Sequence, residues 1–137
     1  MTTGTGAENG MYRAIIVDDQ PVFRNIIRTL LENAGDFEVV GEATDGDEAL
    51  AMFMATQPDL VMMDVQMERV NGFEATSRLV AHDSTAAVVL TSMSQDPEYS
   101  MLAAEAGAIG FFSKRTLEIE GVRRVLLRSR ETGSAAA

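Results

Sequence analysis

Apolar residues gather in short continuous runs, and the segments between these runs carry apolar residues at helical spacing. The runs predict strands over residues 13–18, 37–43, 59–64, 86–92 and 108–114. The segments between and after them predict helices over about 21–34, 46–57, 72–82, 96–107 and 116–130. Strict alternation of five strands with five helices is typical of a parallel sheet covered by helices on both faces.

Residues that start or stop helices support these boundaries. Pro21 fits the first turn of a helix, where its missing N–H costs little, and Gly35 follows the last periodic residue of that helix. Asp47 is a plausible cap for the second helix, which ends before Pro58. The apolar faces expected to pack on the sheet are Phe23, Ile26, Ile27 and Leu30 in the first helix, and Ile119, Val122 and Leu126 in the last.

Four of the five predicted strands end in polar residues. The first strand ends in Asp18 and Asp19, the third in Asp64, the fourth in Thr91 and the fifth in Lys114. A flavodoxin-like doubly wound sheet of five strands has the order 2-1-3-4-5, which places the first strand beside the third. Because ligands of such sheets bind beyond the carboxyl ends of the strands, we expect these side chains to converge on one rim.

Three neighbouring carboxylates require a cation, and oxygen ligands without Cys suit Mg²⁺. A carboxylate can also act as a nucleophile and form an aspartyl-phosphate, with the metal and an ammonium group offsetting charge on the phosphoryl oxygens. No glycine-rich nucleotide loop is present, so the phosphoryl group must arrive on another molecule. Each residue alone has an ordinary explanation, such as a helix cap or a solvated Lys; their placement on one rim favours the site.

Composition narrows the class of protein. The 137 residues suit one domain, the absence of Cys excludes disulfides and thiolate sites and suits a reducing cytoplasm, and no apolar run approaches a membrane span. A formal net charge of −10 disfavours direct binding to nucleic acid. We expect a disordered leader over 1–10, a globular domain over 11–130 and a loose tail over 131–137.

Residues 11–130 resemble the receiver domain of two-component response regulators, through the motifs "IIVDDQP", "PDLVMMDVQM", "NGFE", "VVLTSMS" and "AGAIGFFSK". The resemblance implies a signalling switch rather than a turnover enzyme, with a histidine kinase as donor and Mg²⁺ as cofactor. The stretch "YSMLAAEAGAIGFFSK" is most similar to receivers that precede a LuxR-type helix-turn-helix, which implies a DNA-binding effector outside this chain. Homodimerisation on phosphorylation is a further expectation.

The resemblance also implies roles for individual residues. Asp64 is the phosphorylated residue. The implied metal ligands are Asp19 and Asp64 through their side chains, Asp18 mainly through water, and Gln66 through its backbone carbonyl. The residues implied to contact the phosphoryl group are Thr91 and Lys114, and those implied to form the switch are Thr91 and Phe111.

Three positions depart from the family pattern. Glu68 stands where receivers usually have Pro, which predicts a more mobile loop around Gln66. Arg115 replaces a Pro that is commonly cis, so we expect a trans peptide after Lys114. Phe111 lacks the hydroxyl of a Tyr; we expect it to face the switch side and Phe112 the other, although Phe111 could equally be ordinary core.

Other classes of protein fit the sequence less well. A haloacid-dehalogenase-like phosphohydrolase requires Asp-x-Asp after the first strand, whereas this chain has Asp18, Asp19 and Gln20. A receiver-like adaptor that is never phosphorylated predicts losses in the acidic set, and none is present. A flavodoxin-like FMN binder would not begin its phosphate loop with two carboxylates.

Overall fold

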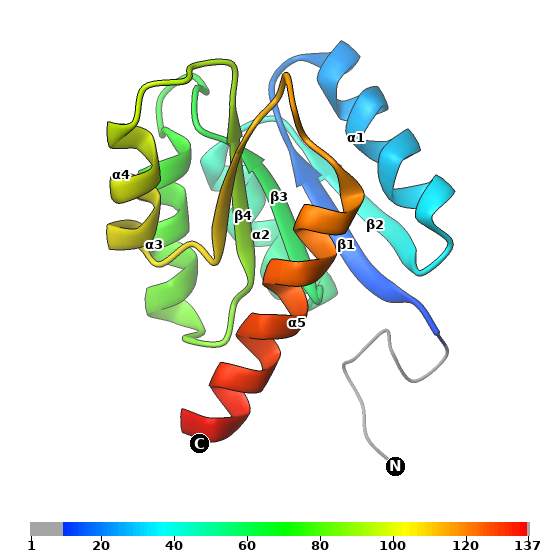
Figure 1. Ribbon diagram of the computed structural model, residues 1–137. Coiled ribbons are helices and arrows are strands. Elements are labelled where there is room, and N and C mark those ends of the chain that lie inside the picture. Colours follow the sequence, from blue (N-terminus) through cyan, green and yellow to red (C-terminus); the bar gives the residue numbers. More distant parts are fainter. Residues whose placement is uncertain (1–9, 137) are drawn as a thin grey trace.

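The computed structural model describes residues 10–136 and shows one five-stranded sheet with helices on both faces (Figure 1). The strands run β2-β1-β3-β4-β5 across the sheet, and every neighbouring pair is parallel. The strands are β1 (Tyr12–Val17), β2 (Phe37–Ala43), β3 (Leu60–Asp64), β4 (Val88–Ser92) and β5 (Gly110–Ser113). The helices are α1 (Pro21–Ala34), α2 (Gly46–Thr56), α3 (Gly72–His82), α4 (Glu98–Ala106) and α5 (Ile119–Ala136). The predicted fold class and strand order are confirmed.

Two apolar cores, one on each face of the sheet, hold these layers together. Side chains alternate along each strand, so Ile15 and Val17 enter the core beneath α2, α3 and α4, whereas Ala14 and Ile16 enter the core beneath α1 and α5. All five residues of β3 are buried because this central strand has helices on both sides. The continuous apolar runs of β3 and β4 are therefore strands without a solvent-facing side.

Most predicted helix ends are confirmed. Pro21 begins α1, and Gly35 and Gly107 end α1 and α4 in the left-handed conformation, with φ of 87° and 100°. The predicted cap of α2 is wrong: Asp45, not Asp47, accepts a hydrogen bond from the N–H of Glu48. The helix begins at Gly46, so the capping carboxylate must lie just before it, and Asp47 already belongs to the first turn.

Several predicted boundaries shift. Helix α5 continues to Ala136, so most of the segment expected as a loose tail after residue 130 is helical. Residues 1–9 of the expected leader lie outside the described residues. Strand β4 begins at Val88 rather than at 86, and β5 spans only Gly110–Ser113. No helix within the described range is long and apolar enough to cross a membrane.

The predicted packing face of α1 is partly wrong. Ile27 and Leu31 are the buried residues of this helix, whereas Ile26 is 52% exposed. The spacing of apolar residues indicates which way the apolar face of a helix points but not how wide it is. Ile26 lies at the outer margin of the apolar face of α1. In α5, Val122 and Leu126 are fully buried and Ile119 packs against them, as expected.

Gly72 allows α3 to begin against the end of β3. Its N–H donates to the carbonyl of Val65 at 2.8 Å. A Cβ at this position would overlap the carbonyl oxygen of Asp64 and lie 2.8 Å from Cα of Val65. These neighbours are backbone atoms, which cannot rotate away as a side chain can.

We therefore expect Gly72→Ala to lower the free energy of unfolding by about 1–3 kcal/mol, measured by urea denaturation. Gly41→Ala is the matched control, because its Cβ would lie 2.5 Å from Sδ of Met52, an atom of a flexible side chain. Gly41→Ala should lower the free energy of unfolding by clearly less than Gly72→Ala does. Equal losses in the two variants would show that the backbone contact at residue 72 is unimportant.

Candidate functional site

Three carboxylates meet at the carboxyl ends of β1 and β3. Asp18, Asp19 and Asp64 each offer one carboxylate oxygen, and these oxygens all lie within 4.8 Å of one another. The two strands are paired neighbours, with Val17 opposite Met63. Asp18 and Asp64, which follow these two residues, therefore lie beside each other. Asp18 and Asp64 are buried and Asp19 is exposed, which leaves the group open to solvent on one side. The predicted convergence of the three acids is confirmed.

Lys114 directly follows the edge strand β5 and reaches the three acids from there. Its N–H donates to the carbonyl of Ser92 at 2.8 Å, which fixes the backbone just beyond β5. Its Nζ lies 2.7 Å from Oδ2 of Asp18 and 3.4 Å from Oδ1 of Asp64, and its side chain is only 3% exposed. One buried ammonium group thus faces two buried carboxylates and cannot neutralise all three acids.

Asp18 Oδ2 is the one buried side-chain oxygen or nitrogen of the described residues without a hydrogen bond. The ammonium of Lys114 is near enough for an ion pair, but the approach lacks the direction of a hydrogen bond. The other oxygen of Asp18 accepts from the N–H of Gln20 at 2.9 Å. A buried carboxylate oxygen without a partner, beside two further carboxylates, fits a hard divalent cation such as Mg²⁺.

Arg24 ties the backbone of the acidic pair to the neighbouring strand. Its Nη1 donates to the carbonyl of Asp18 at 2.8 Å, and its Nε donates to Glu42 of β2 at 3.0 Å. The sequence analysis missed this residue, because only the folded sheet brings Glu42 and Arg24 together. The bridge anchors the start of the loop that carries Asp19.

The environment of Asp64 raises the pKa of its carboxyl group from 3.8 to about 6. Burial is the main cause, and the negative charge of Asp18 adds to it. Lys114 and the backbone N–H of Gln66 oppose this effect by stabilising the charged form. The carbonyl role expected for Gln66 stays a prediction.

Thr91 lies directly opposite Asp64 in the pairing of β3 with β4 and is fully buried. Its hydroxyl is 3.5 Å from the carbonyl of Met63, at the limit of a hydrogen bond. The Thr91 hydroxyl is therefore held only weakly, and its residue pairs with Asp64 across the sheet. Its contact with a phosphoryl group stays a prediction.

Phe111 and Phe112 face opposite sides of the sheet, as expected. Phe111 packs with the core beneath α2, α3 and α4, and Phe112 with the core beneath α1 and α5. The ring of Phe111 lies edge-on to Tyr99 of α4 at 6.1 Å, and Tyr99 in turn lies edge-on to Phe73 of α3 at 5.5 Å. The sequence analysis missed this aromatic series, because no local pattern links three separate elements.

The loop after β3 is tied down by a contact that the sequence analysis also missed. Arg69 adopts the left-handed conformation, with φ of 68°, and its guanidinium pairs with the cap residue Asp45 at 2.5 Å. Because the Arg69 side chain is 70% exposed, this ion pair adds little stability. The greater mobility expected from Glu68 stays a prediction. All peptide bonds in the described range are trans, including that between Lys114 and Arg115.

The raised pKa of Asp64 predicts a pH-dependent cost to the metal-free fold. Stability contributed by this group is fully present below its ordinary pKa of 3.8 and is lost as pH rises through about 6. With a chelator present, Asp64→Asn should therefore gain roughly 2–3 kcal/mol over the wild type between pH 4 and pH 7.5, measured by urea denaturation.

Asp83→Asn is the control, in which the change in stability should have the opposite sign. Hydrogen bonds from Thr85 lower the pKa of Asp83, so the charged form stabilises the fold above its ordinary pKa. This variant should lose stability at neutral pH, and the loss should vanish on acidification. A pH-independent difference between Asp64→Asn and the wild type would contradict the assignment of a raised pKa.

Comparison with known proteins agrees with this geometry. The family model described as the response regulator receiver domain matches residues 14–125. A protein-glutamate methylesterase/protein-glutamine glutaminase of Geobacter sulfurreducens is 36% identical over 87% of this chain, and the transcriptional regulatory protein YxjL of Bacillus subtilis is 38% identical over 79%. The matches cover 31% and 50% of those proteins, so the chain spans only about a third to a half of their length.

Among solved structures, the receiver domain of the response regulator NarL from Mycobacterium tuberculosis superposes with a TM-score of 0.79. It is 31% identical, and the match covers 88% of this chain and 97% of that one. Since the family model covers most of the chain and all four strand ends that carry the site, this chain belongs to the response regulator receiver domain family.

Proposed function

We propose that this domain accepts a phosphoryl group on Asp64 from a sensor histidine kinase and thereby switches an effector. The observation that carries the proposal is the buried Asp64 carboxylate, which lies beside two further acids and 3.4 Å from the ammonium of Lys114. The domain acts as a signalling switch and not as an enzyme that turns over an external substrate.

In the proposed step, an Asp64 carboxylate oxygen attacks the phosphorus of a phosphohistidine. A new P–O bond forms as the P–N bond breaks, and the bonding electrons leave with the histidine nitrogen. The carboxylate must be ionised to attack. Since the pKa of Asp64 is about 6, most of the protein is competent at neutral pH.

The residues present fit Mg²⁺. Asp19 and Asp64 would bind through carboxylate oxygens, Asp18 mainly through water and Gln66 through its backbone carbonyl, as the family resemblance implies. When bound, Mg²⁺ would offset negative charge on the phosphoryl oxygens. The ammonium of Lys114 would have the same electrostatic effect, and Thr91 would donate its hydroxyl to a phosphoryl oxygen.

The effector is best supported as a DNA-binding domain. The YxjL relative is described as a transcriptional regulatory protein, and the solved NarL domain as the receiver of a response regulator. With a net charge of −10, this chain would repel nucleic acid, so DNA contact would fall to the effector. We place the protein in the cytoplasm, which is typical of the family, and homodimerisation on phosphorylation stays a prediction.

Phosphorylation is tested by intact-mass measurement after incubation with acetyl phosphate and Mg²⁺. The wild type should gain one phosphoryl group, Asp64→Asn should gain none, and Asp83→Asn should behave as the wild type. Asp19→Asn should lower labelling at limiting Mg²⁺, because it removes a charged ligand. Labelling of Asp64→Asn equal to that of the wild type would rule out Asp64 as the acceptor.

The output surface proposed here is α4, β5 and α5, switched through Thr91 and Phe111. If Thr91 is drawn toward the phosphoryl group, the space it leaves beside β4 can be filled by the Phe111 ring. Complete burial of a Phe side chain stabilises a protein by about 1.5–3 kcal/mol. Only the difference in burial between the two conformations of Phe111 shifts the equilibrium between them. The alternative is that Phe111 is ordinary core in both states.

Beryllofluoride with Mg²⁺, a phosphate mimic, should therefore change NMR shifts throughout residues 91–115. Thr91→Ala should reduce this change without lowering the affinity for Mg²⁺. Thr56→Ala is the control, because it removes a hydroxyl that bonds only to Met52 within α2. Shifts confined to the three acids and their neighbours would exclude signalling through this surface.

A further inference from the structure

Phe23 lies against the ammonium group of Lys114. The ring centroid is 4.0 Å from Nζ, a distance at which the face of an aromatic ring attracts a cation. Phe23 comes from the first turn of α1, two residues after Pro21, and Lys114 comes from the end of β5. The contact therefore joins the first helix to the last strand at the site.

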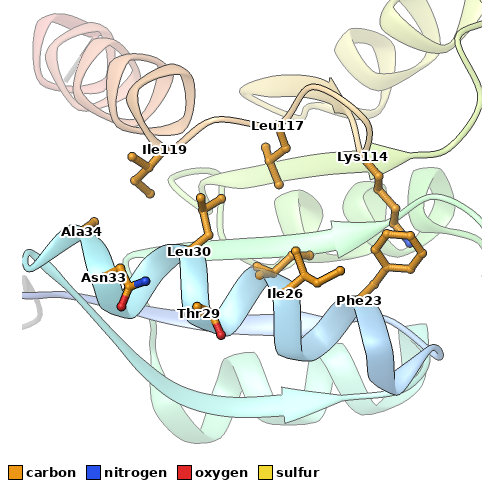
Figure 2. A pocket seen from close by; sticks show the side chains of 10 residues that line it. Phe23, Ile26, Thr29, Leu30, Asn33, Ala34, Lys114, Leu117 and Ile119 are labelled. Atoms are coloured by element: carbon orange, nitrogen blue, oxygen red, sulfur yellow. The ribbon is translucent and has the colours of Figure 1, made fainter.

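The same ring forms the end of a groove between α1 and the segment that leads into α5. This groove has a volume of about 340 Å³, and Figure 2 shows Phe23 and Lys114 side by side at one end of it. Ile26, Leu30 and Leu117 continue its apolar wall. Phe23 and Lys114 both line the groove, so their contact lies where the groove meets the charged cluster.

Directed hydrogen bonding does not fix the ammonium against Asp18. Nζ lies 2.7 Å from Oδ2 of Asp18, but that oxygen has no hydrogen bond, and Asp64 is more distant at 3.4 Å. An ammonium group held mainly by undirected attraction can shift unless a surface behind it limits its position. The ring of Phe23 is such a surface, and its electron-rich face adds attraction that an aliphatic side chain lacks.

We propose that Phe23 is a positioning residue for Lys114. Its ring holds the ammonium group against Asp18 and Asp64 and so sets the rate at which Asp64 accepts a phosphoryl group. This inference rests on the proposed function of Asp64. The helical spacing of apolar residues places Phe23 on the packing face of α1, and a packing role alone is the alternative to be excluded.

The test compares Phe23→Leu, which keeps an apolar side chain but removes the ring, with Phe23→Tyr, which keeps the ring. The first measurement is the NMR shift of the Lys114 ε-protons in the metal-free protein, where the ring should shield them. The wild type and Phe23→Tyr should show shielding, and Phe23→Leu should not. This readout does not depend on phosphorylation.

The second measurement is the initial rate of Asp64 labelling by acetyl phosphate with saturating Mg²⁺. Phe23→Leu should be about threefold to tenfold slower, and Phe23→Tyr should stay within about twofold of the wild type. Phe53→Leu is the matched control, since Phe53 is buried in the core on the other face of the sheet. It should leave both the Lys114 shift and the labelling rate unchanged.

Three results would overturn the inference: an unchanged Lys114 shift in Phe23→Leu, a changed shift with an unchanged labelling rate, or an equal loss of rate in Phe23→Tyr or Phe53→Leu. Failure of the wild type to be labelled at all would instead refute the function proposed for Asp64. The Lys114 shift would still report whether the ring holds the ammonium group.

Discussion

The site depends on an excess of negative charge held at the carboxyl edge of the sheet. Three carboxylate oxygens lie within 4.8 Å of one another, and one ammonium group lies among them. Burial raises the pKa of the Asp64 carboxyl group to about 6, and the negative charge of the neighbouring Asp18 adds to this rise. The rest of the domain supplies the stability that keeps these groups together in spite of the excess charge.

The framework around the cluster explains how it is kept in place. Buried parallel strands on both sides of β3 fix the backbone, and Gly72 lets α3 start in direct contact with the end of that strand. Arg24 holds the carbonyl of Asp18, and Phe23 lies against the ammonium of Lys114. Helix α1 therefore contributes two consecutive residues, one bonded to the backbone of the acidic pair and the other in contact with the ammonium group.

Features that depend on local pattern were predictable from the sequence. Continuous apolar runs identified the strands, Pro21 and Gly35 marked the ends of α1, and polar residues after the strands identified the rim. Contacts between distant segments were not predictable. Neither the pairing of Arg69 with Asp45 nor the contact of Phe23 with Lys114 leaves a sequence signal, because each requires distances that only the folded chain defines. The helical continuation to Ala136 was missed because residues 131–136 include Gly, Ser and Thr, which are weak helix formers.

The position of Lys114 in the chain has a consequence for biosynthesis. Asp18 and Asp64 lie in the first half of the sequence, whereas Lys114, which pairs with both, directly follows the last strand. During translation both acids are therefore made before the lysine that pairs with them. An unfinished chain thus carries the acids of the site without its lysine.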